Sequence, residues 1–247
     1  MKKIITFLIL SFMFFVLTSC YYNTLENNEV IVLAENPTKT LLFLENEYGY
    51  GEATRFVTKT NKDGKVFIKE GKLFPGDVLK VGSFLNQQVD TELLVKMAKE
   101  IKKIFNEGVT KVLTIEASGI PFACAIAMEY NVPFVFAKKG KTSNLPNDVV
   151  SSTVYSYTHK VENHIFVAKE YIKETDKVLI VDDFLANGEA LKGLIEIVEK
   201  CNATVFGCAV QIEKEYQNGG NSLRAKGYNI VSLASIKEIT ENKIKFN

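Results

Sequence analysis

The sequence has few of the residues that build metal sites, disulfide frameworks and nucleic-acid surfaces. It has only two histidines, His159 and His164, and both stand in polar surroundings, so we interpret them as surface residues rather than metal ligands. The four cysteines show no CxxC spacing, which favours buried thiols in an intracellular protein over disulfides or a zinc site. They are Cys20, Cys124, Cys201 and Cys208. A formal net charge of +1 leaves no basic footprint for nucleic acid.

The composition that remains is that of a packed globular protein. Hydrophobic residues make up 47% of the 247 residues and charged residues 24%. These fractions allow a sizeable core and exclude wholesale disorder. The length fits one large domain or two small ones.

The N-terminus differs in character from the rest of the chain. A charged start, Met1–Lys3, precedes the apolar run Ile4–Leu17, which is typical of a signal peptide and too short for a comfortable membrane span. Leu17–Cys20 resembles a bacterial lipobox, in which Cys20 would be lipidated. The alternative is an N-terminal extension that is not a signal. Residues 21–60 carry no motif and no winged-helix pattern, and we interpret them as an unassigned extension or linker.

The most informative stretch runs from residue 178 to residue 190. Val178–Val181 predicts a strand buried on both faces, and we expect Asp182 and Asp183 to end it. A small-residue turn, Ala186–Gly188, then leads into apolar residues at helical spacing. A helix N-terminus suits a phosphate, and a glycine lets the backbone approach it. Two carboxylates beside that phosphate would face hydroxyls or a cation such as Mg²⁺, so the pattern predicts a sugar-phosphate site. The alternative is a βα turn whose aspartates only cap the helix.

Further strands alternate with helices along the chain. We expect a helix from Leu93 to Phe105, ending near Gly108, and a hairpin of two paired strands at 149–158 and 164–168. The other expected strands are Lys111–Ile115, Val132–Ala137, Ala203–Ile212 and Tyr228–Ile236. This alternation predicts an α/β fold with a parallel twisted sheet, helices on both faces, and a ligand at the carboxyl ends of the strands.

The stretch 178–190 resembles the ribose-phosphate motif of the type I phosphoribosyltransferases. Most of that family has Thr or Ser hydroxyls in the loop, whereas the Ala-Asn-Gly-Glu-Ala loop of this chain resembles the xanthine phosphoribosyltransferase branch. The resemblance covers residues 61–247 and implies the type I fold with a small hood subdomain, of which the strand at 228–236 would be part. It also implies Mg²⁺ bound with the diphosphate substrate, a homodimer, and a cytoplasmic location, where phosphoribosyl diphosphate is made.

The implied reaction transfers 5-phosphoribose from phosphoribosyl diphosphate to N9 of xanthine, giving XMP and pyrophosphate, with guanine a poorer substrate. Asp182 and Asp183 would hold the ribose hydroxyls and stabilise the cationic ribose. The residues implied to bind phosphoribosyl diphosphate are Ala186, Asn187, Gly188, Glu189 and Ala190. Ser118 and Gly119 would hold pyrophosphate, with Lys138 and Lys139 at a mobile lid.

The resemblance also implies three purine contacts, namely Leu79, Asn86 and Lys214. On the residues themselves, we would interpret Asn86 as a turn or cap residue. The lysines fit a solvated loop as well as a site for the diphosphate, and Glu213-Lys214 has the alternative of an ordinary charged strand end.

Two other functions stay open. One is a non-catalytic regulator that senses phosphoribosyl diphosphate, although the sequence shows neither a DNA-binding segment nor a basic surface. The other is a surface lipoprotein, anchored through Cys20, that keeps only the fold.

Overall fold

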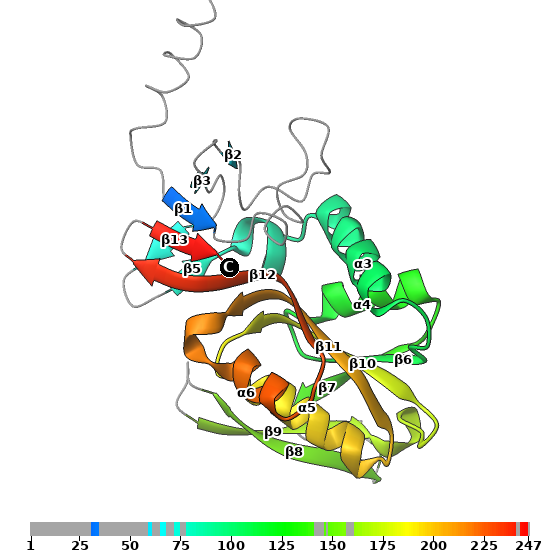
Figure 1. Cartoon of the computed structure of the whole chain (residues 1–247). Helices are drawn as coiled ribbons and strands as arrows, with labels where there is room; N and C mark the ends of the chain where they lie inside the picture. The colour runs from blue at the N-terminus through cyan, green and yellow to red at the C-terminus, as the bar shows by residue number, and fades with distance from the viewer. Residues whose placement is uncertain are drawn as a thin grey trace, which may run out of the picture.

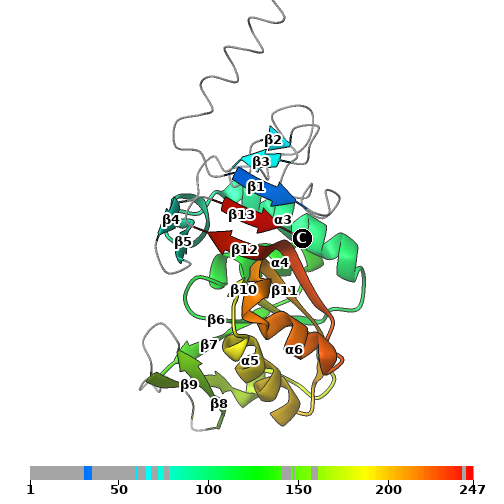
Figure 2. The ribbon, with the colours of Figure 1, turned by 60° about the vertical axis from the view of Figure 1, so that its left-hand side comes forward.

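One long twisted sheet organises the protein in the computed structural model (Figure 1). The structure describes residues 31–34, 59–60, 65–67, 72–74, 78–140, 146, 148–156, 161–240 and 243–246. Among them, eleven strands form a sheet in the order β2-β3-β1-β13-β12-β11-β10-β6-β7-β9-β8. Figure 2 shows this order from β2 at the top of the view to the β8–β9 hairpin at the bottom.

The middle of the sheet is parallel. Its strands, in spatial order, are β7 (Phe134–Lys139), β6 (Lys111–Ile115), β10 (Lys177–Leu185), β11 (Thr204–Lys214) and β12 (Ile230–Thr240). Every residue of β6 is buried, as the continuous apolar run predicts for a strand covered on both faces. The expected parallel α/β sheet is therefore confirmed.

Antiparallel strands extend both edges. On one side β8 (Val149–Ser156) and β9 (Val161–Ala168) form the predicted hairpin, and β9 pairs with the end of β7. On the other side β13 (Lys243–Phe246) pairs with β12, and β1 (Ile31–Ala34) lies between β13 and β3 (Lys65–Phe67), which in turn pairs with β2 (Lys59–Thr60). A separate two-stranded sheet joins β4 (Lys72–Phe74) to β5 (Val78–Lys80).

Helices cover both faces of the parallel strands, as expected. Alternate residues of a strand point to opposite faces. Leu179 and Val181 of β10 pack with α3 (Thr91–Phe105) and α4 (Ile120–Tyr130), whereas Val178 and Ile180 pack with α5 (Glu189–Lys200). The short helix α6 (Gly219–Ala225) adds Leu223 to the second group. Single turns η3 (Gly82–Asn86), η4 (Lys169–Tyr171) and η5 (Glu215–Gln217) connect these elements.

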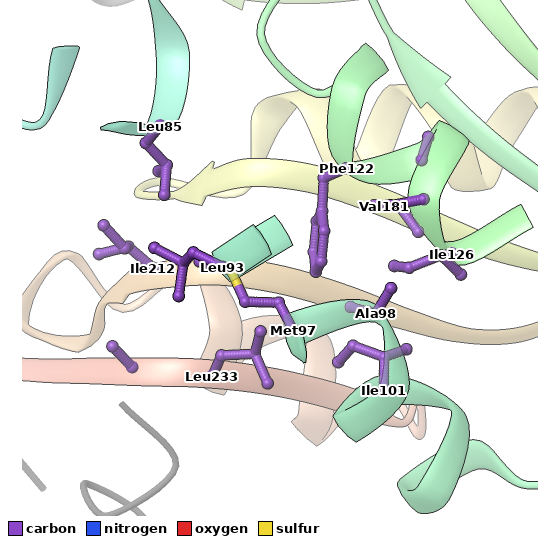
Figure 3. Close-up of a cluster of buried hydrophobic side chains, with 14 of the residues drawn as sticks. Leu85, Leu93, Met97, Ala98, Ile101, Phe122, Ile126, Val181, Ile212 and Leu233 are labelled. Carbon is purple, nitrogen blue, oxygen red and sulfur yellow. The ribbon is translucent and has the colours of Figure 1, made fainter. Parts of the chain in front are cut away.

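The core beneath α3 and α4 follows from the apolar stripe that the sequence predicts. Asp90 caps α3 by accepting a hydrogen bond from Leu93 N at 3.0 Å. Figure 3 shows side chains of the two helices and of the strands meeting in one layer; those labelled include Leu93, Met97, Ile101, Phe122, Ile126, Val181, Ile212 and Leu233. Burial of each such large side chain contributes roughly 1.5–3 kcal/mol.

Two strand predictions need correction. β10 does not end before the acidic pair but continues to Leu185, because β11 runs beside it and pairs Asp182 with Val210 and Leu185 with Glu213. The strand predicted at 228–236 is β12, at 230–240; it belongs to the main sheet rather than to a hood, and β13 follows it.

The structure describes only part of the N-terminal segments for which we made predictions. The signal-like residues 1–20 lie outside the described residues, and the domain boundary at residue 61 stays a prediction. Within 21–60, β1 and β2 join the edge of the sheet. None of the helices in the described part of the chain has the length and apolar character needed to cross a membrane.

A truncated protein that begins at Asn61 should still fold. The described residues of both buried clusters all lie from Leu79 onward, so the truncation leaves the core intact. It removes β1, the parallel partner of β13, so we expect a lower melting temperature than in the full chain. Circular dichroism should show an α/β spectrum and one cooperative thermal transition. A non-cooperative melt would mean that the extension is part of the fold.

Candidate functional site

A cavity of about 750 Å³ opens at the carboxyl ends of the parallel strands. Strands β6, β7, β10 and β11 all end there, which is the expected ligand position in an open α/β sheet. Residues from the end of β10 and the start of α5 line one side, and the β8–β9 hairpin lines the other. The lining residues are Ile115, Glu116, Ser118, Lys139, Val154, Tyr155, Asn163, Ile165, Asp182 to Leu191, Lys214 and Gln217.

Two adjacent carboxylates form the buried part of this cavity. Asp182 is 5% exposed and Asp183 8%. Asp182 Oδ1 accepts a hydrogen bond from Asp183 N at 2.9 Å, and Asp183 Oδ1 accepts one from Phe184 N at 2.9 Å. Burial raises the pKa of Asp182 well above its ordinary value, and the neighbouring charge of Asp183 raises it further. Both side chains therefore favour a partner that brings hydroxyl donors or positive charge.

The loop after β10 has the geometry of an anion site. Gly188 adopts φ +82°, a left-handed conformation that favours glycine, and the next residue begins α5. The first backbone N–H groups of a helix have no intrahelical partner, and the helix dipole is positive at this end. Because Ala186 to Ala190 line the cavity, a phosphate bound there would meet these N–H groups.

The loop after β6 lies against both β6 and the acidic pair. A Cβ atom at Gly119 would lie 2.3 Å from Thr114 Oγ1 and 3.0 Å from Asp182 Oδ1, so only glycine allows this approach. The Glu116–Ala117 peptide bond is cis. The Glu116 carboxylate accepts a hydrogen bond from Lys139 N, which joins this loop to the end of β7.

Most of the residues predicted for the site come together in the cavity. Those that line it are Ser118, Lys139, Asp182, Asp183, Ala186, Asn187, Gly188, Glu189, Ala190 and Lys214. Four others do not: Leu79 is buried in β5, Asn86 is exposed at the end of η3, and Gly119 and Lys138 stand beside lining residues. The three predicted purine contacts stay predictions; of these three, Lys214 is the one that lines the cavity.

Sequence reasoning missed one wall of the cavity. Val154, Tyr155, Asn163 and Ile165 of the hairpin face the loop after β10. The hairpin reaches α5 because Gly193 has no side chain: a Cβ atom there would lie 2.5 Å from Val154 Cγ2. The hairpin itself was predictable, but no local signal showed which helix it packs against.

The described residues hold no group of three or more His, Cys, Asp or Glu side chains that could bind a metal ion. His164 is exposed, and Cys124, Cys201 and Cys208 are free thiols. His159 and Cys20 lie outside the described residues. The two carboxylates are thus the hard oxygen donors that face the cavity from β10.

Comparison with known proteins places this geometry in a family. Residues 85–241 match the phosphoribosyl transferase domain. The xanthine phosphoribosyltransferase of Clostridium novyi is 47% identical over 183 residues, which is 74% of this chain and 96% of the relative. That of Limosilactobacillus reuteri is 44% identical over 181 residues, 72% of this chain and 95% of the relative.

Solved structures agree on the fold. The adenine phosphoribosyltransferase of Rhodothermus marinus has a TM-score of 0.57 at 21% identity and covers 81% of this chain and 99% of its own. That of Giardia lamblia has a TM-score of 0.53 at 27% identity, covering 60% and 81%. These likenesses confirm the type I phosphoribosyltransferase fold.

The acidic pair should make the protein less stable as the pH rises. The raised pKa of Asp182 means that the folded protein loses this proton at a higher pH than the unfolded chain, whose value is about 3.9. Stability is therefore lost as the pH rises from that value through the folded pKa. The amide introduced by Asp182→Asn does not titrate, so the melting temperature of this variant relative to wild type should increase between about pH 5 and about pH 8.

Asp176 provides a control of opposite sign. Burial alone would raise its pKa, but hydrogen bonds from Lys173 N, Lys111 Nζ and Thr110 Oγ1 outweigh burial and hold it below the ordinary value. The carboxylate of Asp176 thus adds stability that is present above its unfolded pKa, about 3.9, and is lost as the pH falls through the folded pKa, so Asp176→Asn should cost more at about pH 5 than at about pH 3. Thermal melts of both variants measure this; parallel pH curves for the two would contradict the assignment.

Proposed function

The chain belongs to the phosphoribosyltransferase family, among relatives that are xanthine phosphoribosyltransferases, and we propose that it makes XMP in purine salvage. The proposed reaction transfers 5-phosphoribose from phosphoribosyl diphosphate to N9 of xanthine and releases pyrophosphate. The observation that carries the proposal is one cavity that holds both a buried carboxylate pair and a loop at a helix N-terminus.

The donor substrate would fit across the end of β10. The backbone N–H groups of Ala186 to Ala190 hold the 5′-phosphate, and Asp182 and Asp183 accept hydrogen bonds from the ribose hydroxyls. As the bond from C1 to pyrophosphate breaks, positive charge develops on the ribose. The carboxylates would stabilise that charge, so catalysis is mostly positioning and electrostatics.

The leaving group would lie between the loop after β6 and the end of β7. Ser118 and Lys139 line the cavity there, and Gly119 and Lys138 are their neighbours. The Lys139 side chain carries positive charge toward Asp182, whose pKa it lowers in part. A lysine at this place can neutralise the departing pyrophosphate. The hydrogen bond from Lys139 N to Glu116 keeps the two sides at a fixed separation.

The donor set also fits Mg²⁺ held mainly by the substrate. Mg²⁺ prefers oxygen ligands and is usually bound through one or two carboxylates plus phosphates. The described residues supply the two carboxylates of β10 and no larger cluster. When bound, Mg²⁺ would neutralise charge on the diphosphate. The protein itself contributes orientation through Asp182 and Asp183.

The purine would be recognised chiefly by Lys214, which lines the cavity at the end of β11. Its ammonium group can only donate, which suits an oxygen of a 6-oxopurine. Leu79 and Asn86 remain proposed contacts on the strength of the family resemblance. We also propose a homodimer in the cytoplasm; sedimentation and cell fractionation would test these two points, and fractionation also tests anchoring through Cys20.

Replacing the acidic pair should remove activity while the fold survives. Asp182→Asn with Asp183→Asn keeps an oxygen acceptor for each backbone hydrogen bond but removes both negative charges. We expect kcat to fall by about 10²-fold or more, because the charge on the ribose loses its stabilisation. The assay follows pyrophosphate release from phosphoribosyl diphosphate with xanthine. The protein truncated at Asn61 serves as control and should keep its activity.

Two outcomes would contradict this assignment. Near-normal turnover of the double variant would mean that the ribose lies elsewhere. If the wild-type protein binds phosphoribosyl diphosphate by calorimetry but releases no pyrophosphate with any purine, the chain is a sensor rather than an enzyme.

Purine choice should depend on Lys214. Xanthine has oxygens at C2 and C6, guanine an amine at C2, and adenine an amine at C6. An unpaired polar group in the closed pocket costs ~1–3 kcal/mol, so adenine should not be used and guanine should be used poorly. Lys214→Met should lower kcat/KM for xanthine most and remove the preference for 6-oxopurines. Steady-state kinetics with xanthine, guanine, hypoxanthine and adenine measure this. Equal use of adenine and xanthine by the wild-type protein would overturn it.

A further inference from the structure

An ion pair between the buried Glu213 and the partly exposed Arg224 lies directly behind the proposed purine contact, Lys214. Glu213 is 1% exposed, and both of its carboxylate oxygens bind Arg224, at 2.8 Å from Oε1 to Nη1 and 2.6 Å from Oε2 to Nη2. The hydroxyl of Ser232 on β12 also donates to Glu213. Such a two-pronged pair fixes both orientation and distance, which a single contact does not. It ties the C-terminal end of β11 to the last turn of α6.

The first turn of the same helix touches the loop proposed to bind phosphate. Gly219 N donates to the carbonyl oxygen of Ala186 at 3.2 Å. A Cβ atom at Gly219 would lie 2.2 Å from that oxygen and 2.6 Å from Gly188 N. The backbone at the start of α6 therefore packs directly against the loop Ala186–Gly188. Any shift of α6 would move the N–H groups that face the cavity.

The backbone of α6 also lies very close to the Glu213–Arg224 ion pair. A Cβ atom at Gly220 would lie 1.9 Å from Glu213 Oε1 and 2.8 Å from Arg224 Nη1, so the helix backbone passes immediately over the ion pair. Neighbouring residues on a strand face opposite sides. Glu213 consequently points to α6, while the next residue, Lys214, lines the cavity.

We propose that Arg224 is a positioning residue for both substrates, acting through Glu213 on Lys214 and through α6 on the loop Ala186–Gly188. This inference rests on the proposed function, because it takes these two elements as the purine and phosphate sites. Arg224 itself touches neither substrate. It holds the two sites at a fixed separation, which the in-line transfer of ribose between them requires.

Arg224→Met tests the proposal against a matched control. Lys111 and Asp176 form a second ion pair with a buried carboxylate, 3.1 Å apart, but at the amino ends of β6 and β10, away from the cavity. Both Arg224→Met and Lys111→Met leave a buried carboxylate without its partner, so both should lower the melting temperature. Only Arg224→Met should raise KM, by about tenfold for xanthine and for phosphoribosyl diphosphate alike. Arg224→Lys keeps the positive charge but cannot form the bidentate contact with Glu213, so its KM values should lie between those of wild type and Arg224→Met.

The outcomes separate this inference from the function on which it rests. Wild-type KM values in both Arg224 variants would overturn it, as would an equal rise of KM in Lys111→Met, which would mark a general effect of destabilisation. Lys214→Met and Gly188→Val are run beside them, because they test the purine and phosphate sites directly. If those two also leave KM unchanged, the site assignment is wrong, and this inference is overturned with it. If Arg224→Met does not fold, Arg224→Lys decides.

Discussion

The burial of two neighbouring carboxylates near the carboxyl end of a central sheet strand is the constraint on which the rest of the structure depends. Asp182 and Asp183 lie in β10 beyond its pairing with β6, where only β11 runs beside the strand, yet both are buried and an apolar residue would be more stable there. Each backbone N–H that follows a carboxylate donates to it, but these bonds do not offset burial beside a like charge. The protein keeps an arrangement that opposes its own stability, a cost that is typical of sites built for a ligand.

Everything else at the carboxyl edge is placed relative to that pair. Parallel pairing brings the ends of β6, β7 and β11 to the same edge as the end of β10, although these ends are far apart in the sequence. Glycines then allow the loops to close over the carboxylates: Gly119 lies against Asp182, and Gly188 turns the chain into α5. A cavity lined by two buried carboxylates, by helix N–H groups and by lysines suits a ligand that is both sugar and phosphate.

Periodicity in the sequence was enough for most of this fold, because apolar runs in a parallel sheet are continuous and distinct. It predicted β6 to the residue, the hairpin and the apolar stripe of α3. It placed the end of β10 too early, because charged residues normally end a buried strand, and here the pairing with β11 carries the strand through them. Strand β1 was missed for a related reason: its pairing partners β3 and β13 lie far away in the chain.

The same contrast holds for the site: residues that lie in one continuous stretch could be predicted, whereas those that depend on contacts distant in the chain could not. Asp182, Asp183 and the loop after them were recognisable because one continuous stretch carries the carboxylates, the glycine and the helix start. From the residues alone Glu213-Lys214 was not, because a charged pair at a strand end is ordinarily solvated on both faces; Lys214 was predicted only through the family resemblance. The fold separates the two: Arg224, eleven positions further on, neutralises Glu213 on the face toward α6, and Lys214 remains on the face toward the cavity. A buried carboxylate with a bidentate partner can orient its neighbour without being near the ligand, and only the packing of α6 reveals which residue has that place.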